Sequence, residues 1–136
     1  MAEYSAFMVL KKKYGDQIVQ KQLRYALDRY LRGRGGESKF EKTLLDNDSQ
    51  QYVWYQKGSL ILYALQDYVS EDSLNAAFSQ FLQDAAFRAE PPFPNTTEWY
   101  SYIKAATPDS LKYFIEDGFE NIVIYENRAK EAIIKE

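Results

Sequence analysis

The sequence has 136 residues, of which 46% are hydrophobic and 27% are charged, and this composition predicts one folded globular domain. It holds no cysteine and no histidine, which excludes disulfides, thiol nucleophiles, the commonest zinc ligand and the usual general base. The net charge is −3, and most of the basic residues of positions 1–50 fall on predicted helices without a phosphate-binding loop, so we expect no nucleic-acid partner.

Two helices and a loop are predicted in the first 50 residues. Residues 2–14 place apolar side chains on one side of a helix that ends at Gly15, a residue suited to a helix C-cap. A second apolar stripe begins at Asp16 and stops at Gly33, which two further glycines follow. Residues 33–50 are polar apart from one Leu-Leu pair, so we expect a surface loop with a single apolar anchor.

The third predicted helix is the expected centre of the core. Asp48 and Gln51 have the spacing of a capping box. The run that follows is apolar on most faces, so we expect residues 60–68 to be the most buried and Trp54 to be partly buried. Its longest near-apolar stretch, residues 58–65, is far shorter than the roughly 20 residues that cross a bilayer, so we expect a soluble chain.

Three more helices are predicted from residues that are typical of helix N-termini. Ser70 is an expected N-cap, Asn95 with Glu98 has the spacing of a capping box, and Thr107 followed by Pro108 is typical of a helix start. We therefore predict an all-α fold, an antiparallel array of about six helices.

The predicted organisation changes after residue 120. Residues 1–120 form the helical unit, and residues 121–136 form a tail that begins with the β-branched and aromatic segment 121–125. A lone strand leaves its backbone groups unpaired. We therefore expect this strand-like tail to pair with another molecule or to begin a β-rich region, with a last helical turn over 129–135 as the alternative.

The sharpest candidate site is the segment 52–58, and it contains Tyr52, Tyr55 and Gly58. The two tyrosines lie three residues apart near the amino end of the third helix, where free N–H groups favour an anion. A glycine beside them lets a ligand approach closely. Two interfacial tyrosines with a packing glycine would show the same pattern, so both interpretations stay open on the residues alone.

Residues 55–58, Tyr-Gln-Lys-Gly, resemble the Tyr-x-Lys-Gly segment of the aminopeptidase N-like zinc metallopeptidases, the gluzincins with an HExxH motif. Residues 1–4 resemble the continuation after that family's glutamate zinc ligand. The segments 30–34, 51–60, 63–65 and 125–129 resemble, more closely, the peptidase domains fused to or encoded with bacterial ABC-type permeases. The resemblance covers essentially the whole chain.

The resemblance implies a role for one residue. Tyr55 would donate its hydroxyl to the oxyanion of the tetrahedral intermediate in peptide hydrolysis, which suits a phenol because it stays protonated at neutral pH. Tyr52 and Gly58 remain substrate-cleft candidates, and we expect Lys57 to be solvated and without a catalytic role. The family's zinc ligands have no counterpart here, so this chain would contain no metal site and no cofactor, and zinc would belong to the full-length peptidase.

The resemblance thus predicts part of a larger, membrane-associated bacterial hydrolase, inactive by itself and completed by a zinc-bearing half and a peptide substrate. Loss of that half would uncover apolar surface and favour self-association through it or through residues 121–126. The alternative is a stand-alone helical protein-interaction module without catalysis. No internal repeat of fixed period supports that alternative.

Overall fold

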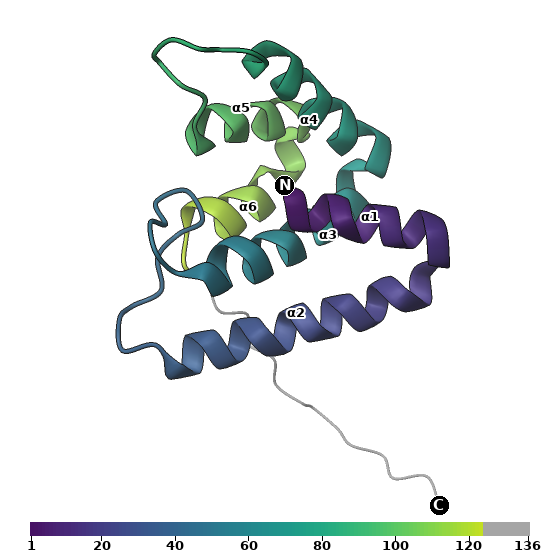
Figure 1. Ribbon diagram of the computed structural model, residues 1–136, viewed down its shortest axis with the longest axis vertical. Helices are drawn as coiled ribbons and strands as arrows, with labels where there is room; N and C mark the ends of the chain where they lie inside the picture. Colours follow the sequence, from purple (N-terminus) through teal and green to yellow (C-terminus); the bar gives the residue numbers. More distant parts are fainter. Residues whose placement is uncertain (124–136) are drawn as a thin grey trace, which may run out of the picture.

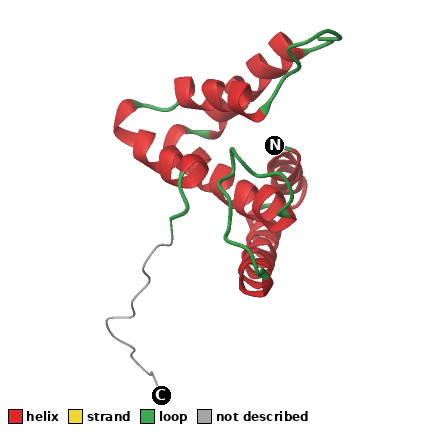
Figure 2. Ribbon diagram, turned by 90° about the vertical axis from the view of Figure 1, so that its left-hand side faces the viewer, coloured by secondary structure: helices red, strands yellow, loops and turns green. Residues whose placement is uncertain are grey.

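A computed structural model describes residues 1–123 and confirms the all-α prediction, because the described residues contain helices and no strand (Figure 2). The α-helices are α1 (Ala2–Tyr14), α2 (Asp16–Gly36), α3 (Gly58–Val69), α4 (Glu71–Ala85), α5 (Thr96–Ala106) and α6 (Lys112–Ile115). Short π- or 3₁₀-helical segments are η1 (Tyr52–Lys57), η2 (Asp109–Leu111) and η3 (Glu116–Glu120). Residues 121–123, at the start of the predicted strand 121–125, form no strand, and the rest of the tail 121–136 lies outside the described residues. In that described part, no helix is both long and apolar enough to span a membrane.

Helices α1 and α2 form an antiparallel hairpin along one side of the molecule (Figure 1). Gly15 joins them with a φ of +81°, a left-handed conformation that favours glycine, and its N–H bonds to the carbonyl of Lys11. Phe7 of α1 and Val19 and Ala26 of α2 are buried in a small cluster between them. The predicted end of the first helix is therefore confirmed.

Helix α3 is the centre of the fold and packs against α1, α2 and α4. Leu62 and Leu65 are almost fully buried in the main core cluster. The predicted burial is wrong at the end of the helix, where Tyr68 is half exposed and its ring lies 5.0 Å from that of Phe114. The rings of α4 and α5 extend the core, as Phe78 and Trp99 show with centroids 5.8 Å apart.

Local capping signals are confirmed at two helices and wrong at a third. The Ser70 hydroxyl accepts the Ser73 N–H at the start of α4, and the Asn95 side chain accepts the Glu98 N–H at the start of α5. The predicted cap Asp48 instead pairs with Lys42 in the preceding loop.

The second helix ends at the last of the three glycines predicted to stop it, Gly36, but α2 continues through Gly33, so the predicted start of the loop at residue 33 is wrong. Gly33 lies where Tyr52 crosses the helix, and a Cβ added there would come 2.6 Å from both Cβ and Cγ of Tyr52. The glycine therefore permits a close approach between α2 and η1 and does not end the helix.

We expect Gly33→Ala to destabilise the fold by about 1–3 kcal/mol, because Cβ of Tyr52 is fixed by the backbone and no side-chain rotation moves it away from the added methyl group. Gly35→Ala is the matched control: nothing lies within 4 Å of its Cβ position, so stability should stay unchanged or rise by up to about 1 kcal/mol. Urea unfolding followed by circular dichroism measures both changes. Equal stability of the two variants would contradict the close approach.

Candidate functional site

Tyr55 lies on a turn of unusual geometry. The π-helical segment η1 runs directly into α3, and the Gly58 N–H bonds to the carbonyls of Val53 and Tyr55. Single π turns are rare and are frequent at functional sites. The Tyr55 side chain is 50% exposed, so its hydroxyl is open to a ligand.

Tyr55 and Tyr52 both line an open groove of about 670 Å³ between α2 and η1. Its walls are mainly polar, and they include Arg29 and Arg32 of α2 and Gln56 of η1. The structure therefore brings the two candidate tyrosines to one groove, which is wide enough for a small molecule or a short peptide segment.

The two tyrosines differ in their surroundings. The Tyr52 hydroxyl is buried and has no hydrogen-bond partner within residues 1–123, and its ring lies 6.1 Å from that of Tyr30. Burial, together with the charge of Glu41, raises the pKa of Tyr52. Tyr52 thus contributes to the groove as a packed wall, and of the two hydroxyls only that of Tyr55 is open to solvent.

The structure does not bring Gly58, the third candidate, to this groove. Gly58 is buried, and a Cβ added to it would lie 3.4 Å from Leu44 Cδ2. It lines a separate cavity together with Leu44 and Trp54. The loop that follows α2 covers this side of the helix with its apolar anchor, so Gly58 acts there as a packing glycine.

Lys57 is the clearest correction in this segment, because it is buried and not solvated. Its ammonium donates to the Glu41 carboxylate at 2.6 Å, and the two side chains are 9% and 2% exposed. Glu41 also accepts from Arg34 at 2.8 Å and from the Tyr30 hydroxyl at 2.9 Å. Burial and the hydrogen bond to Glu41 raise the pKa of Tyr30 to about 12. This buried network ties η1 to α2 and to the loop between them.

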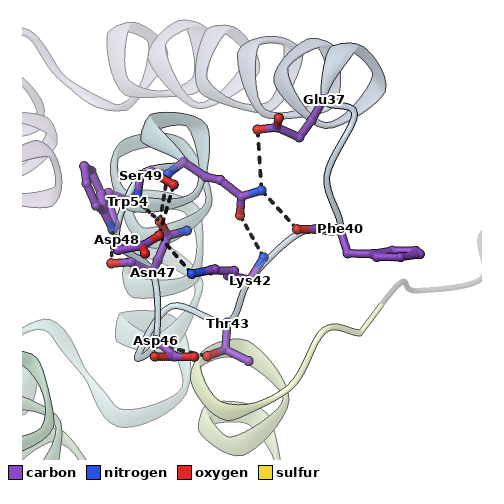
Figure 3. Close-up of polar contacts among 10 residues, drawn as sticks. Glu37, Phe40, Lys42, Thr43, Asp46, Asn47, Asp48, Ser49 and Trp54 are labelled. Carbon is purple, nitrogen blue, oxygen red and sulfur yellow. Dashed lines mark hydrogen bonds and ion pairs between the residues drawn. The ribbon is translucent and has the colours of Figure 1, made fainter.

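The loop 37–50 is held by a second set of hydrogen bonds (Figure 3). The buried Gln50 side chain accepts the Lys42 N–H and donates to the Phe40 carbonyl and the Glu37 carboxylate. The Trp54 indole donates to the Asn47 carbonyl at 2.9 Å. The loop therefore forms a fixed wall next to η1.

Sequence reasoning missed Glu41, Gln50 and Gly33, which hold the groove together. Glu41 is 16 positions from Lys57 in a segment without periodicity, so nothing local marks the pair. The sequence does contain a signal near Gly33, namely three glycines within four positions. Such a cluster is as typical of a helix end as of a close contact between two helices, so it did not identify the contact.

The part of the chain that the structure describes holds no group of three or more His, Cys, Asp or Glu side chains that could bind a metal ion. The resemblance assigns zinc to the full-length peptidase and not to this chain. What the arrangement offers by itself is an open phenol hydroxyl on a fixed turn at the wall of a polar groove.

No protein-family model, characterised protein or solved structure matches this sequence.

Proposed function

We propose that this chain is the helical part of a zinc aminopeptidase-like peptidase, in which Tyr55 donates a hydrogen bond to the oxyanion formed during peptide-bond hydrolysis. The observation that carries the proposal is the half-exposed Tyr55 phenol on the π turn beside an open polar groove. A donor of this kind speeds hydrolysis when it is held in place before charge develops on the carbonyl oxygen.

The surroundings of Tyr55 support such preorganisation. Lys57, two residues away, is fixed by the buried Glu41 carboxylate, and Tyr52, three residues away, is fixed against Gly33. The turn that carries Tyr55 is therefore restrained on both sides, which reduces the reorganisation needed in the transition state. The groove is the proposed place of the peptide substrate.

In this proposal the zinc ligands lie in another segment of the full-length protein. We expect the isolated chain to bind no zinc with useful affinity at neutral pH, because scattered carboxylates are poor substitutes for His and Cys ligands. Isothermal titration calorimetry checks this, with a zinc-binding peptide as the positive control. Stoichiometric binding of zinc by the isolated chain would contradict the assignment of the metal to another segment.

The reading frame that encodes the chain tests the peptidase proposal most simply. An HExxH motif ending about nineteen residues before Met1, followed by a glutamate at the ligand position, is the expected result. The proposal also places the full-length protein at a bacterial membrane with an ABC-type permease, which a transporter segment in the same frame or operon would support. A start codon at Met1 would favour the helical interaction module instead.

A further inference from the structure

The Tyr55 groove contains an arginine that has no carboxylate partner within residues 1–123. Arg29 of α2 lines the groove. Its guanidinium donates to the Tyr25 hydroxyl at 3.0 Å and lies 5.6 Å from the centre of that ring. Tyr25, one turn earlier on α2, therefore restrains the arginine. A guanidinium has more N–H donors than this one bond uses, so Arg29 can still bind an anionic group in the groove.

The other charged groups of the described lining are Arg32, Asp28 and Glu37. Arg32 Nε lies 2.9 Å from an oxygen of the Asp28 carboxylate, so these two charges offset each other. Glu37 follows the end of α2, eight positions after Arg29, and the rise of an α-helix makes this a separation of roughly 12 Å. Salt at physiological concentration screens most of an interaction over that distance. The groove is therefore positive around Arg29.

Arg29 and Tyr55 lie at the same level on opposite sides of the groove. Gly33 of α2 meets Tyr52, and Leu60 of α3 packs against the small cluster between α1 and α2, so the chain after Tyr52 runs antiparallel to α2 (Figure 1). In this register, the position four residues before Gly33 is level with the position three residues after Tyr52. Packed helices lie about 8–10 Å apart, a gap that a ligand side chain beside the Tyr55 hydroxyl can cross to reach Arg29.

We propose that the groove selects peptides with an acidic side chain beside the bond that is cleaved, and that Arg29 binds this carboxylate. The inference rests on the proposed function, because it takes the groove as the peptide site. A carboxylate fits because it can accept two parallel N–H bonds from a guanidinium. A phosphate dianion is less suited, since Arg29 is the single cation of the described lining without a carboxylate partner.

Peptide binding to the chain can be followed in ¹⁵N–¹H spectra through the Arg29 side-chain signal and the Tyr55 amide signal. The probes are acetyl-Ala-Glu-Ala-amide and acetyl-Ala-Gln-Ala-amide, which differ only in a carboxylate or a neutral amide at the same position. At low ionic strength we expect the Glu peptide to bind about tenfold more tightly, because its hydrogen bonds to the guanidinium are charge-assisted. It should move both signals.

Arg29→Gln should reduce the preference for the Glu peptide to about twofold or less, because the side chain keeps a donor and loses its charge. Arg24→Gln is the matched control. It removes the same charge from the exposed surface of the same helix, at a position that is not among the described residues of the groove. The Arg24 variant should keep the full preference.

Equal affinity of the two peptides for the natural chain would overturn the role of Arg29 and leave the proposed peptidase function standing. An equal loss of preference in the Arg29 and Arg24 variants would also overturn it, because the net charge of α2, and not the groove, would then attract the peptide. If neither peptide binds, or if binding moves neither the Arg29 nor the Tyr55 signal, both this inference and the groove as the peptide site are contradicted.

Discussion

Tyr55→Phe is expected to lower the turnover of the proposed full-length peptidase by about 100-fold or more, while the Michaelis constant stays within a few-fold. The hydrogen bond from the phenol strengthens only as negative charge develops on the carbonyl oxygen. Its loss therefore raises the barrier without weakening substrate binding by a similar factor. Steady-state kinetics with a peptide amide or ester substrate measure both constants.

Tyr52→Phe is the matched control for this variant. It removes a hydroxyl from the same groove, but one that is buried and has no hydrogen-bond partner in the described chain. Neither turnover nor stability should fall. Equal losses in the two variants would show that the groove, and not the Tyr55 donor, is what the reaction needs.

The largest expected effect on stability comes from the buried pair of Glu41 and Lys57. We expect Glu41→Gln alone to cost about 3–5 kcal/mol, because it leaves Lys57 as a buried, uncompensated charge. Lys57→Met should cost less, because Arg34 still pairs with the Glu41 carboxylate. The double variant should lose less free energy of unfolding than the two single variants lose together, since it removes both charges. Urea unfolding of the four proteins gives the coupling energy.

The exposed pair of Lys42 and Asp48 provides the comparison. It has a similar N–O distance of 2.9 Å, but its side chains are 43% and 72% exposed, so solvent screens the interaction and Lys42→Gln should change stability little. Additive effects in the Glu41 and Lys57 cycle, no larger than those of this surface pair, would contradict the role of the buried pair in holding η1.

Features fixed by a few neighbouring residues could be predicted from the sequence. Gly15, Ser70 and Asn95 each end or begin a helix through contacts within four positions along the chain, and these are confirmed. The apolar run after Val53 likewise predicted the buried helix α3. Local physical chemistry was sufficient for the all-α fold.

Features that depend on contacts between distant residues could not be predicted. The Gly33 contact with Tyr52 and the Lys57 pair with Glu41 join segments that are 19 and 16 positions apart. A lysine in an amphipathic region is usually solvated, so nothing in the sequence marked Lys57 as buried. The Gly33 contact with Tyr52 lies in the wall of the groove, so the sequence offered its two tyrosines as candidates without indicating that α2 forms the other side.

The most direct test of the central claim compares how Tyr55→Phe affects the binding of two inhibitors to the proposed full-length peptidase. A phosphonate dipeptide carries the anionic oxygen of the tetrahedral intermediate, whereas a non-hydrolysable substrate analogue carries none. If Tyr55 stabilises the oxyanion, the variant should bind the phosphonate more weakly by a factor close to its loss in kcat/KM and bind the substrate analogue within about twofold of the natural enzyme. Equal weakening of both inhibitors, or of neither, would contradict the assignment of Tyr55 as the oxyanion donor.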